Sequence, residues 1–261
     1  CVANYWYLDK LNKEGIKLYV EPVSNDAGTA IGAALLLYHQ VTKDNKVRPH
    51  AETIYEGFPY CHSLNEISDT ASKYGADVID TTDEEVVKLI TNKNIVTIWQ
   101  GRSENGPRAL GNRSLLFDPT FEDGKDHVNR VKRREYFRPF AGTILLEHAH
   151  DWFDMKGMEQ SPHMMYAMDC KEGVAEKIPS IIHVDGTCRI QTVTRQQNEH
   201  YYDIIKEFYE QTGVPIIFNT SFNLGGEPLV ETLDDAIRTL YSSEIEYLYL
   251  PENGLMVELK N

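Results

Sequence analysis

Basic side chains are concentrated in one segment of the chain, residues 101–138, which opens with GRSENGPRALGNRSLLFDP. Nine arginines and lysines stand there beside six acidic residues, although the whole chain has a formal net charge of -14. Three glycines and a proline are interleaved with the first arginines, which suggests a tight loop that presents backbone N–H groups beside guanidinium groups. Both kinds of donor bind phosphate oxygens. The segment therefore predicts a focused anion site, with Arg102, Arg108 and Arg113 as candidate ligands.

The end of the same segment, VNRVKRREYFR, predicts a highly charged helix over residues 123–135. A solvated helix face is the simpler interpretation of Arg130, Arg133 and Arg134. Lys132 and Arg138 stand on either side of the aromatic pair that follows. Spacing alone leaves open whether either of them reaches into the anion site from the helix end.

Two further groups of residues could contribute to such a site. The apolar run in VPIIFNTSFNLGGEP ends in Asn219, Ser221 and Asn223, and α/β sheets place ligands at strand ends of this kind. A turn made by asparagine and glycine fits the same spacing equally well. In IHVDGTCRIQ an Asp-Gly pair predicts a turn between two strands, and Arg189 follows it as either a phosphate ligand or a structural residue.

Several other chemistries are poorly supported. His148 and His150 form only a weak metal-binding pair, and surface histidines are commoner. The sequence has no Walker A motif, nucleophile elbow or dinucleotide fingerprint, which argues against hydride transfer and serine hydrolysis. The four cysteines are widely spaced without a CxxC pair, so we expect reduced thiols in a cytoplasmic protein.

Alternating strand and helix signals surround these groups and must position them. The predicted strands cover residues 95–100, 114–117, 140–146, 164–168, 181–184, 189–194, 215–219 and 247–250, with helices between them. This pattern is typical of an α/β fold with a twisted mixed sheet and packed helices. The first third predicts helix, strand and helix at residues 2–12, 16–22 and 27–41, followed by a polar linker from residue 42.

Composition excludes several classes of protein. The 261 residues are 41% hydrophobic and 10% aromatic, which is too apolar for a disordered chain. The clearest apolar run, residues 31–38, is far shorter than the roughly 20 residues that cross a bilayer, so no membrane partner is expected. A net charge of -14 argues against general nucleic-acid binding. We expect small-molecule substrates, and leave a homodimer open.

Four separated motifs carry a resemblance to a known family. They read GRSENGPRALGNRSLL, KRREYFRPFAG, HVDGTCRIQTV and TGVPIIFNTSFNLGGEPLVET, and cover about residues 82–245. In this order they resemble the carboxy-terminal domain of the O-carbamoyltransferases of the NodU, CmcH and TobZ type. The resemblance implies a YrdC-like α/β domain that binds carbamoyl phosphate and ATP with Mg²⁺, forms carbamoyl adenylate with release of pyrophosphate, and serves transfer to a hydroxyl acceptor.

The resemblance also implies roles for individual residues. Lys132, Arg138 and Arg113 are the expected catalytic residues. The expected ligands of substrate and nucleotide are Arg102, Arg108, Arg189, Asn219, Ser221 and Asn223. Residues 61–261 are the expected YrdC-like domain.

The first 60 residues resemble the end of the preceding domain in the same enzymes, which has an actin-like ATPase fold. There SNDAGTAIGAAL matches a segment whose aspartate, here Asp26, is a metal ligand, although a helix cap is an equally simple role. Iron or another divalent metal is expected only in the complete upstream domain. Because the chain begins at Cys1 without Met, we expect it to be a fragment.

Two alternative functions stay open at this point. One is a threonylcarbamoyl-adenylate-synthase-like enzyme, which the acidic charge and the actin-like segment disfavour. The other is a non-catalytic nucleotide-binding or RNA-binding module, which would bind ATP without releasing pyrophosphate.

Overall fold

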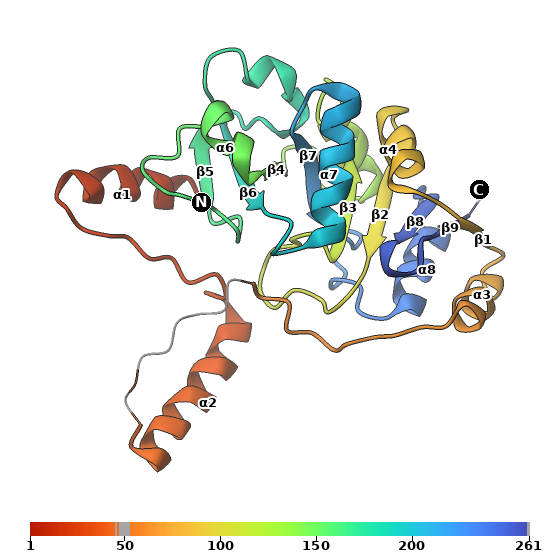
Figure 1. The fold of residues 1–261 in the computed structure, drawn as a ribbon, viewed down its shortest axis with the longest axis horizontal. Coiled ribbons are helices and arrows are strands. Elements are labelled where there is room, and N and C mark those ends of the chain that lie inside the picture. Colours follow the sequence, from red (N-terminus) through yellow and green to blue (C-terminus); the bar gives the residue numbers. More distant parts are fainter. Residues whose placement is uncertain (45, 47–52, 260–261) are drawn as a thin grey trace.

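The computed structural model describes residues 1–44, 46 and 53–259, and these form one nine-stranded sheet with helices on both faces (Figure 1). The strand order is β1-β9-β8-β2-β3-β7-β4-β6-β5. Only β2/β8 and β4/β6 pair in parallel, so the expected mixed α/β sheet is confirmed. The strands are β1 (Asp77–Asp80), β2 (Val96–Trp99), β3 (Arg113–Phe117), β4 (Ala141–Leu145), β5 (Tyr166–Asp169), β6 (Thr187–Val193), β7 (Ile216–Ser221), β8 (Tyr247–Leu250) and β9 (Leu255–Glu258).

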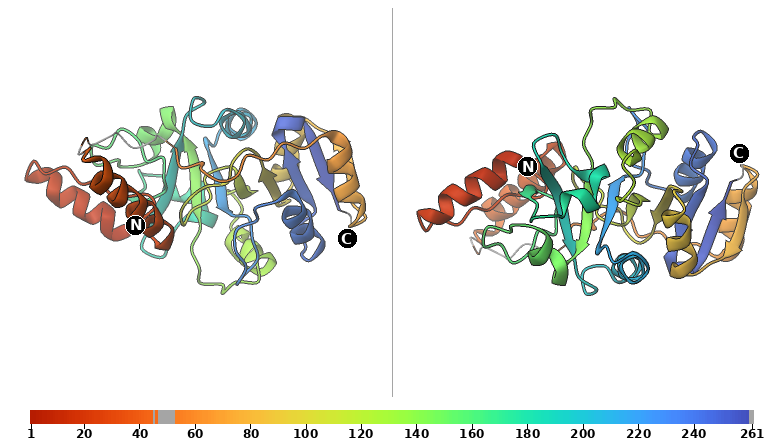
Figure 2. Two further views of the ribbon diagram at one scale, coloured as in Figure 1. Left: turned by 90° about the horizontal axis from the view of Figure 1, so that it is seen from below. Right: turned by 90° about the horizontal axis from the view of Figure 1, so that it is seen from above.

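Helices cover both faces of this sheet. Figure 2 shows α7 on one side of the sheet and α5 and α8 on the other, and α4 packs against α7. The helices are α1 (Val2–Lys13), α2 (Asp26–Thr42), α3 (Leu64–Ser72), α4 (Asp83–Thr91), α5 (Gly124–Val131), α6 (Leu146–Trp152), α7 (Glu199–Thr212) and α8 (Leu233–Tyr241), with short 3₁₀ turns at Ala175–Lys177, Pro179–Ile181 and Pro251–Asn253. The central strands β2, β3 and β4 are buried along their whole length between these layers.

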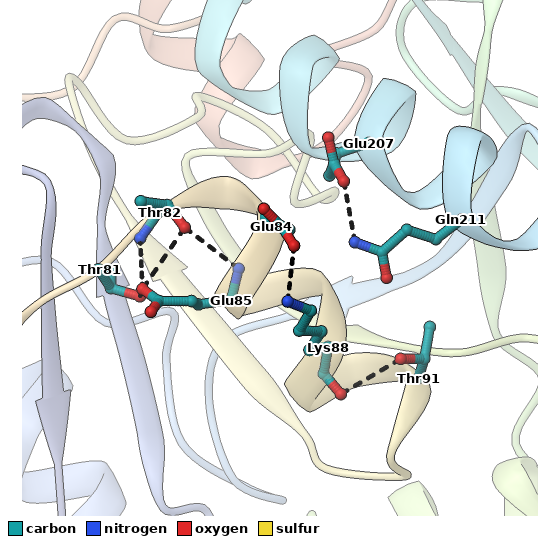
Figure 3. Close-up of polar contacts among 8 residues, drawn as sticks. All are labelled: Thr81, Thr82, Glu84, Glu85, Lys88, Thr91, Glu207 and Gln211. Atoms are coloured by element: carbon teal, nitrogen blue, oxygen red, sulfur yellow. Dashed lines mark hydrogen bonds and ion pairs between the residues drawn. The ribbon is translucent and has the colours of Figure 1, made fainter.

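Side-chain caps explain where several helices begin. At α4, the Thr82 hydroxyl accepts from the Glu85 backbone N–H at 3.3 Å, and the Glu85 carboxylate accepts from the Thr82 backbone N–H at 3.1 Å (Figure 3). This reciprocal capping box satisfies two backbone donors that a helix start leaves unpaired. Capping boxes also begin α3 and α8. Helix α7 ends at Gly213, whose φ of +74° is in the left-handed region.

Some predicted elements are wrong, each for a local reason. The helix predicted to residue 135 ends at Val131, because Arg133 has a left-handed φ of +54°. Residues 181–184 form no strand, since the chain leaves a 3₁₀ turn that begins at Pro179. The predicted Asp-Gly turn is present, with Gly186 at φ +80°, but only one strand, β6, adjoins it. Residues 16–22 also form no strand, and the short edge pair β1/β9 was not predicted.

The first two helices differ in how they meet the sheet. Helix α1 packs on β5, where Asn4 Nδ2 donates to the Met165 carbonyl at 2.9 Å. Helix α2 has no buried residue and projects away from the sheet (Figure 1). Residues 45 and 47–52 of the predicted linker lie outside the described residues. The domain boundary at residue 60 stays a prediction. None of the described helices combines the length and apolarity needed to cross a bilayer.

Candidate functional site

The basic residues meet at a cavity of about 480 Å³ beside the end of β7, which we call the arginine cavity. Its lining residues are Pro107, Arg108, Ala109, Arg134, Phe137, Arg138, Pro139, Met164, Arg189, Asn219, Thr220 and Ser221. A second hollow of about 720 Å³, the adjoining cavity, shares Arg134, Arg138 and Ser221 with it. The adjoining cavity adds Asn223, Gly225 and Gly226 from the loop after β7. The two hollows together can hold a ligand with several phosphate groups.

Strand register places two of the expected ligands on one face of the sheet. Ala141 of β4 pairs with Arg189 of β6 on one side and with Asn219 of β7 on the other. Paired residues on neighbouring strands point to the same face, so Arg189 and Asn219 stand about 10 Å apart across a small alanine. Arg189 and Asn219 both line the arginine cavity, whereas Ala141 between them is fully buried and lies outside the lining.

A buried carboxylate holds the loop that carries Arg108. One oxygen of Glu104 accepts the backbone N–H groups of Leu110 at 2.6 Å and of Asn112 at 2.8 Å. The other oxygen has no hydrogen-bond partner among the described residues, and burial raises the pKa of Glu104. In the same loop Gly111 has a φ of +114°, and a Cβ there would lie 2.2 Å from the Tyr201 ring. The loop conformation thus depends on the Glu104 carboxylate and on the absence of a side chain at Gly111.

Three arginines of the cavity carry unneutralised charge. The Nε atoms of Arg108, Arg134 and Arg189 are buried and have no hydrogen-bond partner among the described residues. Burial, reinforced by the neighbouring Arg108 and Arg134, lowers the pKa of Arg189 to about 9. Burial also lowers the pKa of Arg108 and of Arg134. Half-buried cations with unpaired donors are stabilised by an anion, and phosphate oxygens fit guanidinium donors well.

Lys132 lies beneath the end of β7 and is only 1% exposed. Its Nζ donates to the Ser221 carbonyl, to the Ser221 hydroxyl at 3.5 Å and to Asn223 Oδ1 at 3.1 Å. Burial lowers the pKa of Lys132 well below its ordinary value, and Arg134 adds repulsion. The structure therefore brings Lys132, Ser221 and Asn223 into direct contact. The three oxygens that Lys132 contacts are uncharged, so they do not neutralise its positive charge.

Arg138 lies at the rim, where both cavities include it. Its Nε donates to Glu135 at 2.5 Å, and both side chains are exposed. This contact raises the pKa of Arg138. Glu135 also lines the adjoining cavity, so the carboxylate and a bound phosphate would compete for the same guanidinium.

Two expected ligands lie outside both linings. Arg113 is fully buried, donates to the carbonyls of Gln100, Asn112, Gly101 and Glu231, and stacks on Trp99 with its guanidinium carbon 4.3 Å from the ring centre. Arg102 is exposed and donates to the Gly57 carbonyl at 3.1 Å. The structure thus does not bring them together with Arg108: Arg113 contacts backbone carbonyls, Arg102 contacts the segment of Gly57, and their expected roles stay predictions.

Arg134 is the cavity residue that sequence reasoning missed. Treated as part of a solvated helix face, it lies beyond the last residue of α5 and lines both cavities. Arg130 does form a surface ion pair with Glu244 at 2.6 Å, as expected. Arg133 is exposed, but it lies beyond α5 and also lines the adjoining cavity. Because a helix turns about 100° per residue, extending it to residue 135 gave Arg134 the wrong direction. No periodicity in KRRE marks the helix end.

The expected metal ligand, Asp26, belongs to no cluster of metal-ligating side chains among the described residues. Asp26 is the first residue of α2 and exposed, while Asn25 occupies the N-cap position. Within residues 1–44, 46 and 53–259, no three His, Cys, Asp or Glu side chains come together as a metal site. His148 packs its ring on Tyr209, with 4.5 Å between centres. The residues present do not form a metal centre, and the role of Asp26 stays a prediction.

Comparisons with known proteins agree with the motifs. A family model described as carbamoyltransferase C-terminus matches residues 87–257. Nodulation protein NolNO of Sinorhizobium fredii (strain NBRC 101917 / NGR234) is 36% identical over 247 residues, which cover 92% of this chain and 36% of that protein. Nodulation protein U of Rhizobium fredii is 31% identical over 228 residues, covering 87% of this chain and 37% of that protein.

Solved structures give a more distant likeness. Full-length HypF, in a phosphate- and nucleotide-bound form, aligns with a TM-score of 0.43 and 18% identity over 64% of this chain and 21% of that one. The chain spans a little over one third of the length of both nodulation proteins. The family match covers most of the sheet and every residue that lines the arginine cavity. The chain belongs to the carbamoyltransferase C-terminus family.

Proposed function

We propose that the arginine cavity and the adjoining cavity bind carbamoyl phosphate and ATP and form carbamoyl adenylate. The observation that carries the proposal is the set of three half-buried arginines, Arg108, Arg134 and Arg189, whose buried Nε atoms have no hydrogen-bond partner and which form no ion pair among the described residues. Carbamoyl phosphate and the triphosphate of ATP supply the missing anions, and family membership favours carbamoyl chemistry. Mg²⁺ would enter as the complex with ATP.

The chemistry needs positioning and charge stabilisation more than a side-chain nucleophile. Water releases phosphate from carbamoyl phosphate, an oxygen of the resulting carbamate attacks the α-phosphorus of ATP, and pyrophosphate leaves. Negative charge moves among phosphate oxygens in both steps, so fixed cations that need no reorganisation lower the barrier. Lys132 would hold the strand end that carries Ser221 and Asn223 against the transferred phosphate, and Arg138 would exchange Glu135 for the ligand.

The carbamoyl group would then pass to a hydroxyl acceptor in the whole protein. We propose that an upstream actin-like domain with its metal binds this acceptor. We also propose a cytoplasmic location, and a homodimer stays possible within the proposal. A threonylcarbamoyl-adenylate-synthase-like reaction would use the same cations with threonine and bicarbonate. A non-catalytic nucleotide-binding module would use them for ATP alone.

Pyrophosphate release from ATP separates these functions. We expect release that depends on carbamoyl phosphate, and that Arg134→Ala lowers at least about 100-fold, since the residue contacts charge developed in the transition state. Arg130→Ala is the matched control, because Arg130 is ion-paired with Glu244 on the surface. Release that requires threonine and bicarbonate instead, or ATP binding without release under all conditions, would contradict the proposal.

A further inference from the structure

Asn219 has an unusual combination of properties for a residue of the cavity lining. It is 1% exposed, lines the arginine cavity, and its Oδ1 has no hydrogen-bond partner among the described residues. Its Nδ2 is fully engaged on the other side, donating to the Ala109 carbonyl at 3.1 Å and to Thr143 Oγ1 at 3.0 Å. A buried acceptor without a donor is costly, so such an atom needs an explanation.

The surrounding network fixes which way the Asn219 amide points. The Ala109 carbonyl can only accept, so the atom facing it must be the amide nitrogen. Gln191 is oriented in the same way, because its Nε2 donates to the Leu110 carbonyl at 3.0 Å. Its Oε1 therefore accepts the Thr143 hydroxyl at 2.9 Å. An inverted Asn219 amide would set oxygen against a carbonyl oxygen.

Tyr201 completes this directed network. Its hydroxyl donates to Thr143 Oγ1 at 2.8 Å, so the threonine oxygen receives Tyr201 and Asn219 while donating to Gln191. Each of these four side chains thus donates to an acceptor within the protein. The Asn219 oxygen is the one acceptor of this group left over, and its residue borders the cavity beside Arg189. A networked and buried amide of this kind is rigid.

We propose that Asn219 Oδ1 accepts an N–H of the carbamoyl group and thereby selects carbamoyl phosphate over acyl phosphates that have no N–H donor. This inference rests on the proposed function and adds a basis for discrimination between carbamoyl phosphate and acyl phosphates. Carbamoyl phosphate presents phosphate oxygens and an amide N–H within one small molecule. That pattern matches the arginine cavity, whose lining includes the basic residues Arg108 and Arg189 together with Asn219. Acetyl phosphate has nearly the same shape but replaces the NH₂ group by a methyl group.

The test measures binding of carbamoyl phosphate and of acetyl phosphate by calorimetry in the absence of ATP. For the parent chain we expect carbamoyl phosphate to bind about 10- to 100-fold more tightly, since acetyl phosphate leaves the buried acceptor unpaired. In Asn219→Leu the ratio should fall to within about 3-fold, because the acceptor is gone. A purely structural role of Asn219 would weaken both ligands equally and leave the ratio unchanged.

Asn219→Asp is the conservative companion variant. It keeps an oxygen at the position of Oδ1, and at a pH low enough to protonate it beside the arginines the new carboxyl can still donate to the Ala109 carbonyl, so we expect the preference to be retained there even if the leucine variant fails to fold. Equal affinities in the parent chain, together with carbamoyl-phosphate-dependent pyrophosphate release, would overturn the inference alone. Undetectable carbamoyl phosphate binding and no release would overturn the proposed function as well. Weaker ATP binding in Asn219→Leu with an unchanged ratio would instead assign Oδ1 to the adenine amino group and overturn the inference.

Discussion

Replacement of Arg189 by methionine should stabilise the ligand-free chain while removing its response to phosphate. Burial and the neighbouring arginines lower the pKa of Arg189 from its ordinary value of 12.5 to about 9. A shift of this size corresponds to about 5 kcal/mol at neutral pH. Because the cavity is open to water, we expect the free energy of unfolding of Arg189→Met to exceed that of the parent chain by only about 2 kcal/mol. That increase would raise Tm by about 4–8 °C.

The pH dependence of this effect has a definite sign. The folded state releases the Arg189 proton more readily than the unfolded chain, so the unfolded chain binds more protons between about pH 9 and 12.5. The cost of the buried charge is therefore complete below pH 9 and is relieved as pH rises through that value. The stability difference between Arg189→Met and the parent chain should be largest at pH 7.5 and smaller at pH 9.5.

Urea denaturation at both pH values, with and without pyrophosphate, measures the two parts of this prediction. At 100 times Kd, pyrophosphate should stabilise the parent chain by about 2.7 kcal/mol and the variant much less. Arg130→Met is the control, since its surface ion pair with Glu244 should contribute no more than about 1 kcal/mol. The electrostatic reasoning is refuted if Arg189→Met is less stable than the parent chain by more than about 1 kcal/mol, or keeps the full pyrophosphate response.

Three further changes test other parts of the site and the fold. Glu135→Gln removes the carboxylate that competes for Arg138, so KM for ATP should fall a fewfold in steady-state pyrophosphate assays while kcat is unchanged; an increase in KM would contradict the exchange. Lys132→Met removes the buried Nζ contacts to Ser221 and Asn223 and should lower kcat at least about 100-fold, with the circular dichroism spectrum retained; ordinary turnover would contradict a role for Lys132 in the site. Thr82→Ala breaks the capping box of α4 and should cost about 1 kcal/mol in thermal unfolding without any change in pyrophosphate release.

Sequence patterns predicted the elements with strong periodicity and failed where tertiary contacts decide. The buried strands β2, β3 and β7 each contain a short run of β-branched or large apolar residues, and their positions were predicted within one or two residues. Strand β1 was missed because DVID is polar and mostly exposed, whereas β9 is an apolar and mostly buried stretch of four residues that was also not predicted. A short polar edge strand has no alternating pattern that distinguishes it from a loop.

The site was predictable as a collection of residues but not as a geometry. Arg108, Arg138, Arg189, Asn219 and Ser221 line one cavity, as their polar or basic character beside turns and strand ends suggested. Arg113 has the same kind of neighbours in sequence, yet its guanidinium donates its hydrogen bonds to backbone carbonyls. The direction of a long side chain depends on strand register and on the exact end of a helix, and neither is encoded in local composition.

The most direct test of the central claim is detection of the product itself. The chain would be incubated with ATP and ¹⁴C-labelled carbamoyl phosphate, quenched, and separated by chromatography with mass identification. The account predicts a labelled adenylate that accumulates in step with pyrophosphate, is absent without ATP, and is lost in Arg134→Ala but not in Arg130→Ala. Label that stays in carbamoyl phosphate or its breakdown products while ATP is unchanged, or equal adenylate formation by Arg134→Ala, would contradict it.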